Sequence, residues 1–167
     1  EDPRVGQVLE CLPGANCGGC GYPGCGGLAT AIVEGKAPVN ACAVGGPSAA
    51  NAIAAVMGVV AEEKEPTVAF VKCGGTCEKA KNNYEYDGID DCVMASQLVG
   101  STSKSCAYGC MGYGSCVKSC QFDAIHVVDG VAVVDKEKCV ACGKCVAACP
   151  KRLIELVPYT AEHLVQC

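Results

Sequence analysis

Four cysteines within eleven residues constrain the fold of this chain more than any other feature. Cys139, Cys142, Cys145 and Cys149 follow the spacing C-x2-C-x2-C-x3-C, and Pro150 comes directly after the last of them. Spacers this short allow three consecutive thiolates to bind three irons of one [4Fe–4S] cluster, while the fourth cysteine faces away and reaches a second cluster. A structural zinc site is the alternative, but zinc usually takes two separated cysteine pairs.

A related segment precedes this one. The stretch from Cys116 to Val127 resembles the stretch from Cys145 to Leu156, each being a cysteine run, a short helical turn and an apolar strand. Between them, Ile125–Val128 and Val131–Val134 flank Asp129-Gly130, a strong signal for a two-residue hairpin. We therefore expect a repeat that binds two clusters.

The crossover rule divides the cysteines of this repeat between the two clusters. One cluster takes Cys139, Cys142, Cys145 and Cys120, the last of these from the first half. The first half has Tyr113 where its middle cysteine would stand, so we expect Cys106 to replace it. The other cluster would then take Cys106, Cys110, Cys116 and Cys149. Tyr113 itself is a less favoured ligand, since thiolate is the usual one.

A separate set of cysteines lies near the start of the chain. Cys17, Cys20 and Cys25 stand in a glycine-rich loop, and Cys42 follows after a longer spacer. Glycine lets the backbone curl closely around a bulky group and aim N–H groups at its sulfurs. Three clustered cysteines and one remote cysteine predict a further [4Fe–4S] site.

Helical patterns surround that loop. Asp2-Pro3 predicts the start of a helix that Pro13-Gly14 ends. Shorter and longer helices are predicted over Leu28–Glu34 and Ser48–Glu63. Cys11 lies just off an apolar stripe, and we expect an ordinary, partly buried thiol there.

The middle of the chain carries three more cysteines, at Cys73, Cys77 and Cys92, after a predicted strand over Val68–Lys72. They could belong to a further cluster, but three ligands need a fourth, and both Cys106 and Cys167 could supply it. Without Cys11, sixteen cysteines remain, enough for four clusters. Buried thiols or a redox pair are the alternative. Ser101–Ser105 is predicted to be a polar linker.

Composition supports cofactors over a large apolar core. The 167 residues include 17 cysteines, no Trp and two Phe, so little apolar bulk is present to hold the fold. The net charge of −5 disfavours nucleic-acid binding. We find no nucleotide-binding motif, no nucleophile–base arrangement, no signal peptide and no segment long enough to span a bilayer. We expect a soluble chain.

These segments together resemble the RnfB subunit of the Rnf complex, a membrane-bound ferredoxin:NAD oxidoreductase that pumps sodium ions or protons. The resemblance rests on Leu12 to Ala29, on Cys42 to Pro47, and on Cys106 to Ile125 in its clostridial form. It implies an electron-relay subunit that takes electrons from reduced ferredoxin and passes them to other subunits, at the cytoplasmic face of a prokaryotic membrane. The chain departs from the family in lacking the N-terminal membrane helix, so we expect a fragment of a longer subunit.

The predicted fold class is α+β, built of small iron–sulfur domains. We expect a mostly helical cluster domain over residues 1–65, a connecting segment over 66–104, a dicluster ferredoxin-like domain over 105–157, and a tail over 158–167. A stand-alone polyferredoxin or the electron-input domain of another oxidoreductase remains an alternative, and a zinc-binding interaction module is less favoured.

Overall fold

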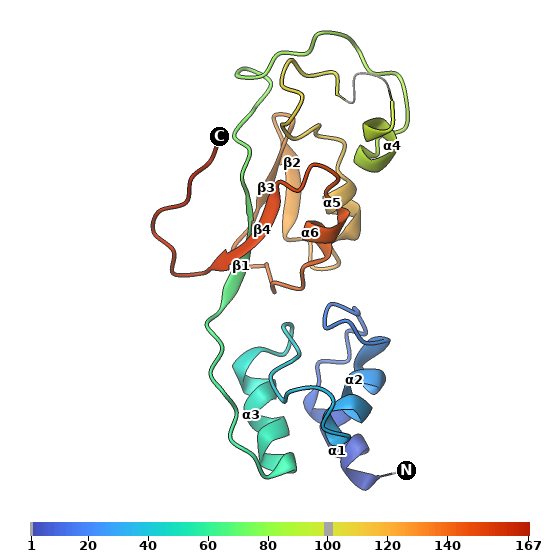
Figure 1. Cartoon of the computed structure of the whole chain (residues 1–167), viewed down its shortest axis with the longest axis vertical. Helices are drawn as coiled ribbons and strands as arrows, with labels where there is room; N and C mark the ends of the chain where they lie inside the picture. Colours follow the sequence, from blue (N-terminus) through green and yellow to red (C-terminus); the bar gives the residue numbers. More distant parts are fainter. Residues whose placement is uncertain (1, 99–101) are drawn as a thin grey trace. The chain divides into compact units, whose positions relative to one another are not determined.

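The computed structural model describes residues 2–98 and 102–167. Contacts divide it into two compact units, with the boundary between Pro66 and Thr67. The N-terminal unit is helical, and the C-terminal unit combines short helices with two-stranded sheets (Figure 1). The predicted α+β class is confirmed.

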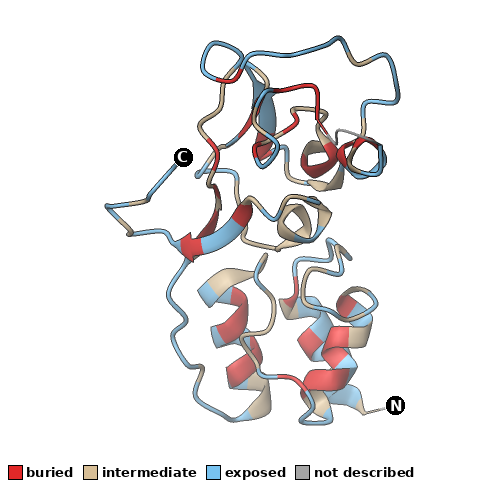
Figure 2. Cartoon of the chain, turned by 45° about the horizontal axis from the view of Figure 1, so that its top comes forward, coloured by how far each residue is buried: buried red, intermediate tan, exposed pale blue. Residues whose placement is uncertain are grey.

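Three helices form the N-terminal unit: α1 (Pro3–Cys11), α2 (Gly24–Val33) and α3 (Gly46–Met57). Helix α1 packs against both of the others. Their shared core contains Val8, Leu28, Ile32 and Ile53, all at most 2% exposed, and the buried residues line the facing sides of the helices (Figure 2).

The helix ends show where local sequence was informative. Asp2 caps α1 as expected, since its carboxylate accepts the N–H of Arg4 at 3.0 Å. The predicted extension of α3 to Glu63 is wrong, because Gly58 adopts a left-handed conformation with φ +69° and ends the helix after Met57. Helix α2 begins at Gly24, before the predicted start at Leu28.

The C-terminal unit contains all four strands and three helices of five residues each. Strand β1 (Thr67–Val71) pairs antiparallel with β4 (Ile154–Pro158), and Val68 lies opposite Val157. Strands β2 (Ile125–Val128) and β3 (Val131–Val134) form the predicted hairpin, which turns at Asp129-Gly130. The helices are α4 (Cys92–Ser96), α5 (Ser115–Ser119) and α6 (Lys144–Ala148).

The pairing of β1 with β4 has a consequence for the segment between β1 and the first cysteines of the repeat. That segment starts and ends within one compact unit, together with the ferredoxin-like repeat and the C-terminal tail. It includes the residues that we expected to form a connecting piece.

The expectation of a polar linker at Ser101–Ser105 is wrong for the residues that the structure describes. Thr102, Ser103 and Lys104 are 7%, 6% and 5% exposed. The reason is backbone pairing: Asn83 donates to the Ser103 carbonyl at 2.7 Å, and Ser105 donates to the Lys81 carbonyl at 2.8 Å. Ser101 lies outside the described residues.

Across the described ranges, no helix is both long enough and apolar enough to cross a membrane.

We predict that Ile53→Ala weakens the N-terminal unit selectively. Ile53 is fully buried between the helices, and truncating a buried isoleucine to alanine costs about 2–5 kcal/mol. Native-state hydrogen exchange should therefore quicken at least about tenfold in α1–α3 and stay unchanged in β1 and β4. Val60→Ala is the control, because Val60 is 91% exposed. Equal exchange rates in wild type and Ile53→Ala would contradict this packing.

Candidate iron–sulfur sites

One pocket in the C-terminal unit gathers the four cysteines of the predicted second cluster. Cys120, Cys139, Cys142 and Cys145 all line it, and its other walls are mostly apolar, with Ala69 of β1 and Leu156 of β4 among them. The backbone N–H of Ala69 donates to Cys139 Sγ at 3.4 Å. Strand β1 therefore serves as a wall of this pocket.

A second pocket holds four cysteines, but one of them differs from the expected set. Cys92, Cys110, Cys116 and Cys149 line this pocket. Cys106 is not among its lining residues. The structure thus places Cys92 of α4 where the spacing had placed Cys106.

Two contacts explain how α4 reaches this pocket. The N–H of Cys92 donates to Ser115 Oγ at 2.7 Å, which joins the start of α4 to the start of α5. The Asp91 carboxylate caps α4 by accepting the N–H groups of Val93 and Met94. Cys92 is buried as a result.

Tyr113 is engaged away from the pocket. Its hydroxyl lies 3.2 Å from Ser103 Oγ, and its ring packs against Tyr86 with centroids 4.7 Å apart. It does not line the pocket of Cys92 in the described structure. These contacts favour a packing role for Tyr113.

The two pockets exchange cysteines between the halves of the repeat. Cys120 ends α5 but lines the pocket of Cys139, Cys142 and Cys145, whereas Cys149 ends α6 but lines the pocket of the first half. Both residues leave their helix with extended backbone angles. This is the crossover typical of two-cluster ferredoxins.

The N-terminal unit brings together three of its four expected ligands. Cys25 is buried in the helical core, with Cys20 and Cys42 packed against it. Cys17 lies in the loop that leads to Cys20. The thiol of Cys42 accepts the N–H of Gly45 at 3.3 Å.

Asn16 is a positioning residue that the sequence reasoning missed. Its Oδ1 accepts the N–H of Cys25 at 2.8 Å, and its Nδ2 donates to the Gly14 carbonyl at 3.2 Å. The backbone of Asn16 is left-handed, with φ +46°, which asparagine tolerates better than most residues. The side chain thus fixes the start of α2 and the place of Cys25.

Burial makes these thiols weak acids in the protein without bound metal. It raises the pKa of Cys116 to about 12 and that of Cys145 to about 11, and neighbouring cysteines add to both shifts. Burial likewise raises the pKa of Cys42 and of Cys110. These four thiols are therefore protonated at neutral pH, and a metal that binds them must displace those protons.

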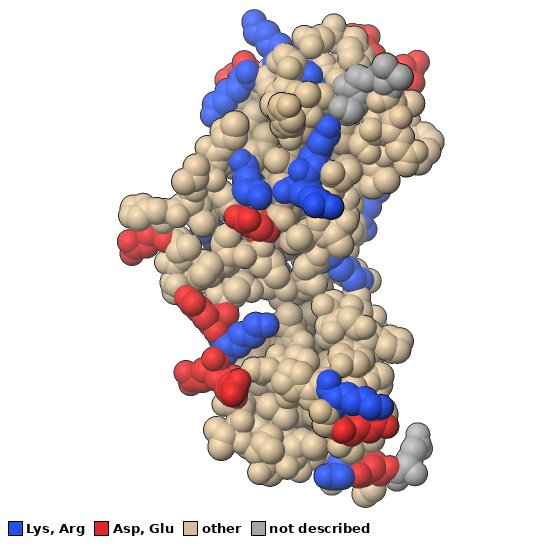
Figure 3. Space-filling model, in the orientation of Figure 1, with Lys and Arg blue, Asp and Glu red and all other residues tan. Residues whose placement is uncertain are grey.

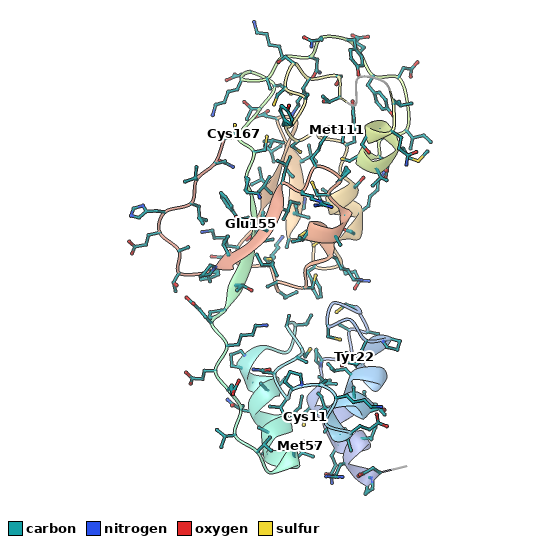
Figure 4. The ribbon with its side chains drawn as sticks, viewed as in Figure 1. Cys11, Tyr22, Met57, Met111, Glu155 and Cys167 are labelled. Atoms are coloured by element: carbon teal, nitrogen blue, oxygen red, sulfur yellow. The ribbon has the colours of Figure 1, made fainter. Side chains whose placement is uncertain are left out.

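The remaining cysteines lie outside the two pockets. Cys73 is buried, Cys106 is half-buried, and Cys77 and Cys167 are exposed. Cys11 is a half-buried thiol at the end of α1, as expected, and packs against the helical core (Figure 4).

The residues of the two pockets fit an iron–sulfur cluster. Each pocket supplies four thiols and apolar walls, which is the donor set of a [4Fe–4S] cluster. In the described ranges, no three or more His, Cys, Asp or Glu side chains are grouped as ligands of a single metal ion.

Comparison with protein families agrees with these sites. Residues 12–44 match a family described as "Putative Fe-S cluster", and residues 132–155 match a "4Fe-4S binding domain". The fold and the cysteine pockets thus define an iron–sulfur protein with a ferredoxin-like C-terminal unit.

Comparison with curated relatives narrows this class. The chain is 54% identical over its full length to the RnfB subunit of the "Na(+)-translocating ferredoxin:NAD(+) oxidoreductase complex" of Acetobacterium woodii, of which it covers 50%. It is 44% identical over 99% of its length to the same subunit of the "Proton-translocating ferredoxin:NAD(+) oxidoreductase complex" of Clostridium ljungdahlii, of which it covers 59%. The corresponding subunit of the "Ion-translocating oxidoreductase complex" of Methanosarcina acetivorans is 46% identical over 84% of the chain, which covers 53% of that protein.

The chain belongs to the RnfB family of subunits of the Rnf complex. It spans about half the length of these relatives.

We predict that Asn16→Ala loosens the N-terminal site. Losing the acceptor of the Cys25 N–H costs about 1–3 kcal/mol, so iron should leave this site for a chelator at least about fivefold faster. Asn16→Asp keeps an oxygen acceptor and should release iron near the wild-type rate. Asn51→Ala, an exposed position on α3, is the control. Wild-type release from Asn16→Ala would show that the bond does not hold the site.

Proposed function

We propose that this chain binds at least three [4Fe–4S] clusters and serves as an electron-relay part of an ion-translocating ferredoxin:NAD oxidoreductase complex. The exchange of Cys120 and Cys149 between two four-cysteine pockets carries this proposal. A [4Fe–4S] cluster supplies a carrier of single electrons when bound. The protein supplies thiolates, apolar walls and N–H donors, and has no substrate-transforming site of its own among the described residues.

The proposed ligands fall into three sets. The N-terminal set is Cys17, Cys20, Cys25 and Cys42. The two sets of the C-terminal unit are Cys120, Cys139, Cys142 and Cys145, and Cys92, Cys110, Cys116 and Cys149. The last set departs from the spacing-based expectation in taking Cys92 in place of Cys106, because Cys92 lines that pocket.

Backbone donors are the means by which the chain tunes these sites. The N–H of Ala69 points to Cys139 Sγ, and that of Gly45 points to Cys42 Sγ. A hydrogen bond to a ligand sulfur stabilises the more negative state of a cluster and so raises its potential. Apolar walls keep water from the sulfurs and act in the opposite direction.

The proposed partners follow from the names of the relatives. We infer that ferredoxin donates electrons to this chain, and that other subunits of the membrane complex receive them. The same reasoning places the chain at the cytoplasmic face of a prokaryotic membrane.

The assignment of Cys92 has a direct test in iron content. Cys92→Ala and Cys149→Ala should each remove one cluster, or about four iron per chain. If both residues bind the same cluster, the double variant should also lose about four. Cys11→Ala, which alters a thiol outside every proposed set, is the control. A loss of about eight iron in the double variant would show that Cys92 and Cys149 belong to different clusters.

Electron transfer can be tested separately. Reduced ferredoxin, added without oxygen to the purified holoprotein, should bleach its visible cluster absorption and give EPR signals of reduced clusters. Dithionite reduction of the same sample is the control. Bleaching by dithionite without any bleaching by ferredoxin would contradict ferredoxin as the donor.

A further inference from the structure

We infer that Cys73, Cys77, Cys106 and Cys167 form a fourth iron–sulfur site, with the buried Lys104 as its counter-charge. The inference rests on the iron–sulfur role proposed above. It begins from the four cysteines, other than Cys11, that remain once the three proposed sets are complete.

Two of these sulfurs lie close together. The point where a Cβ on Gly109 would stand is 3.4 Å from Cys106 Sγ and 3.5 Å from Cys73 Sγ. The two sulfurs are therefore no more than about 7 Å apart. They are free thiols and not a disulfide. A separation of this order suits ligands that bind different irons of one cluster.

Backbone pairing brings Cys167 to the same place. Its N–H donates to the Lys72 carbonyl at 2.8 Å, and its carbonyl accepts the N–H of Gly74 at 2.8 Å. This is the hydrogen bonding of parallel strands, with Cys167 directly opposite Cys73. Residues paired in this way project their side chains from the same face. Gln166 adds two bonds from Nε2, to the carbonyls of Val71 and Cys73, and Figure 4 shows Cys167 beside the segment that follows β1.

Cys77 reaches the group from the tip of the β2–β3 hairpin. Its N–H donates to the Asp129 carbonyl at 2.8 Å. A Cβ on Gly130 would stand 2.7 Å from Cys77 Sγ and 3.4 Å from Lys104 Nζ. The thiol and the ammonium therefore lie on the same side of the hairpin turn, within about 6 Å of each other.

Lys104 gives this cluster of thiols its chemical meaning. Its side chain is buried, and its ammonium donates to the carbonyls of Gly75, at 3.0 Å, and Gly130. In the described residues no carboxylate forms an ion pair with it. A buried ammonium without a counter-charge is costly. Four thiolates around a cluster, with a net charge of roughly −2, would supply that counter-charge.

The bonds to Cys73 fit an anionic sulfur as well. Its Sγ accepts the N–H of Gly75 at 3.3 Å and the N–H of Cys110 at 3.4 Å. Cys110 itself lines the pocket of Cys92. One residue thus contacts the proposed fourth site with its backbone and the neighbouring pocket with its side chain, so the two sites are adjacent.

The C-terminal unit has the charge to carry three such sites. It contains ten of the thirteen Lys and Arg residues of the chain, and most of those visible in Figure 3 lie on it. Its formal charge is −1, against −4 for the N-terminal unit. Additional cluster charge is therefore less unfavourable in this unit.

Iron and sulfide analysis of anaerobically purified holoprotein tests the inference. The wild type should hold about sixteen iron per chain, and Cys77→Ala and Cys106→Ala about twelve each. The double variant should also hold about twelve, because both residues bind one cluster. Cys92→Ala combined with Cys106→Ala should fall to about eight, since these residues bind different clusters. Cys11→Ala is the control.

Other results would overturn the fourth site without touching the other three. Wild-type iron in Cys77→Ala, or bound zinc in place of the extra iron, would exclude a cluster on Cys77. Equal iron in Cys106→Ala and in Cys92→Ala with Cys106→Ala would place Cys106 in the ferredoxin repeat. About twelve iron in the wild type would leave three clusters and no fourth.

A second variant tests the role of Lys104 without removing a ligand. Lys104→Met keeps a similar length and removes the charge. It should retain the full iron content and lower the midpoint potential of one cluster in an EPR-monitored titration, while the others stay unchanged. Lys118→Met, an exposed position in α5, is the control. Unchanged potentials in Lys104→Met would refute the counter-charge role.

Discussion

The exchange of one cysteine between the two halves of the ferredoxin-like repeat is the constraint on which the C-terminal unit depends. Because Cys120 lies in the pocket of the second half and Cys149 in that of the first, neither half completes its set of thiols alone. The hairpin of β2 and β3 and the pairing of β1 with β4 hold the halves in this relation. A unit with few large apolar side chains is thereby tied together through its proposed ligands.

Charge sets the second condition. Burial raises the pKa of Cys116 and of Cys145 and keeps both thiols protonated at neutral pH in the metal-free protein, so cluster assembly must release protons and bring in iron. The assembled sites would then be anionic, and the chain meets this with N–H donors such as those of Ala69 and Gly45. At one place it uses a full positive charge, the buried ammonium of Lys104.

Local sequence predicted what local geometry determines. The hairpin at Asp129-Gly130 and the cap at Asp2 depend on neighbouring residues, and both are confirmed. The pairing of β1 with β4 and the entry of Cys92 into a pocket depend on residues far apart in the chain, so spacing could not reveal them. Cys106 looked like the missing ligand because it stands four residues before Cys110. The substitution of Tyr113 for a cysteine was the sequence signal that a ligand had to come from elsewhere.

Anomalous diffraction at the iron absorption edge, from crystals of the anaerobically purified chain, tests the central claim most directly. The account predicts compact iron density beside each proposed set of thiols, with Cys92 bound to the cluster that Cys110, Cys116 and Cys149 share. Iron peaks that fall away from these cysteines, or Cys120 and Cys149 bound each within its own half of the repeat, would contradict it.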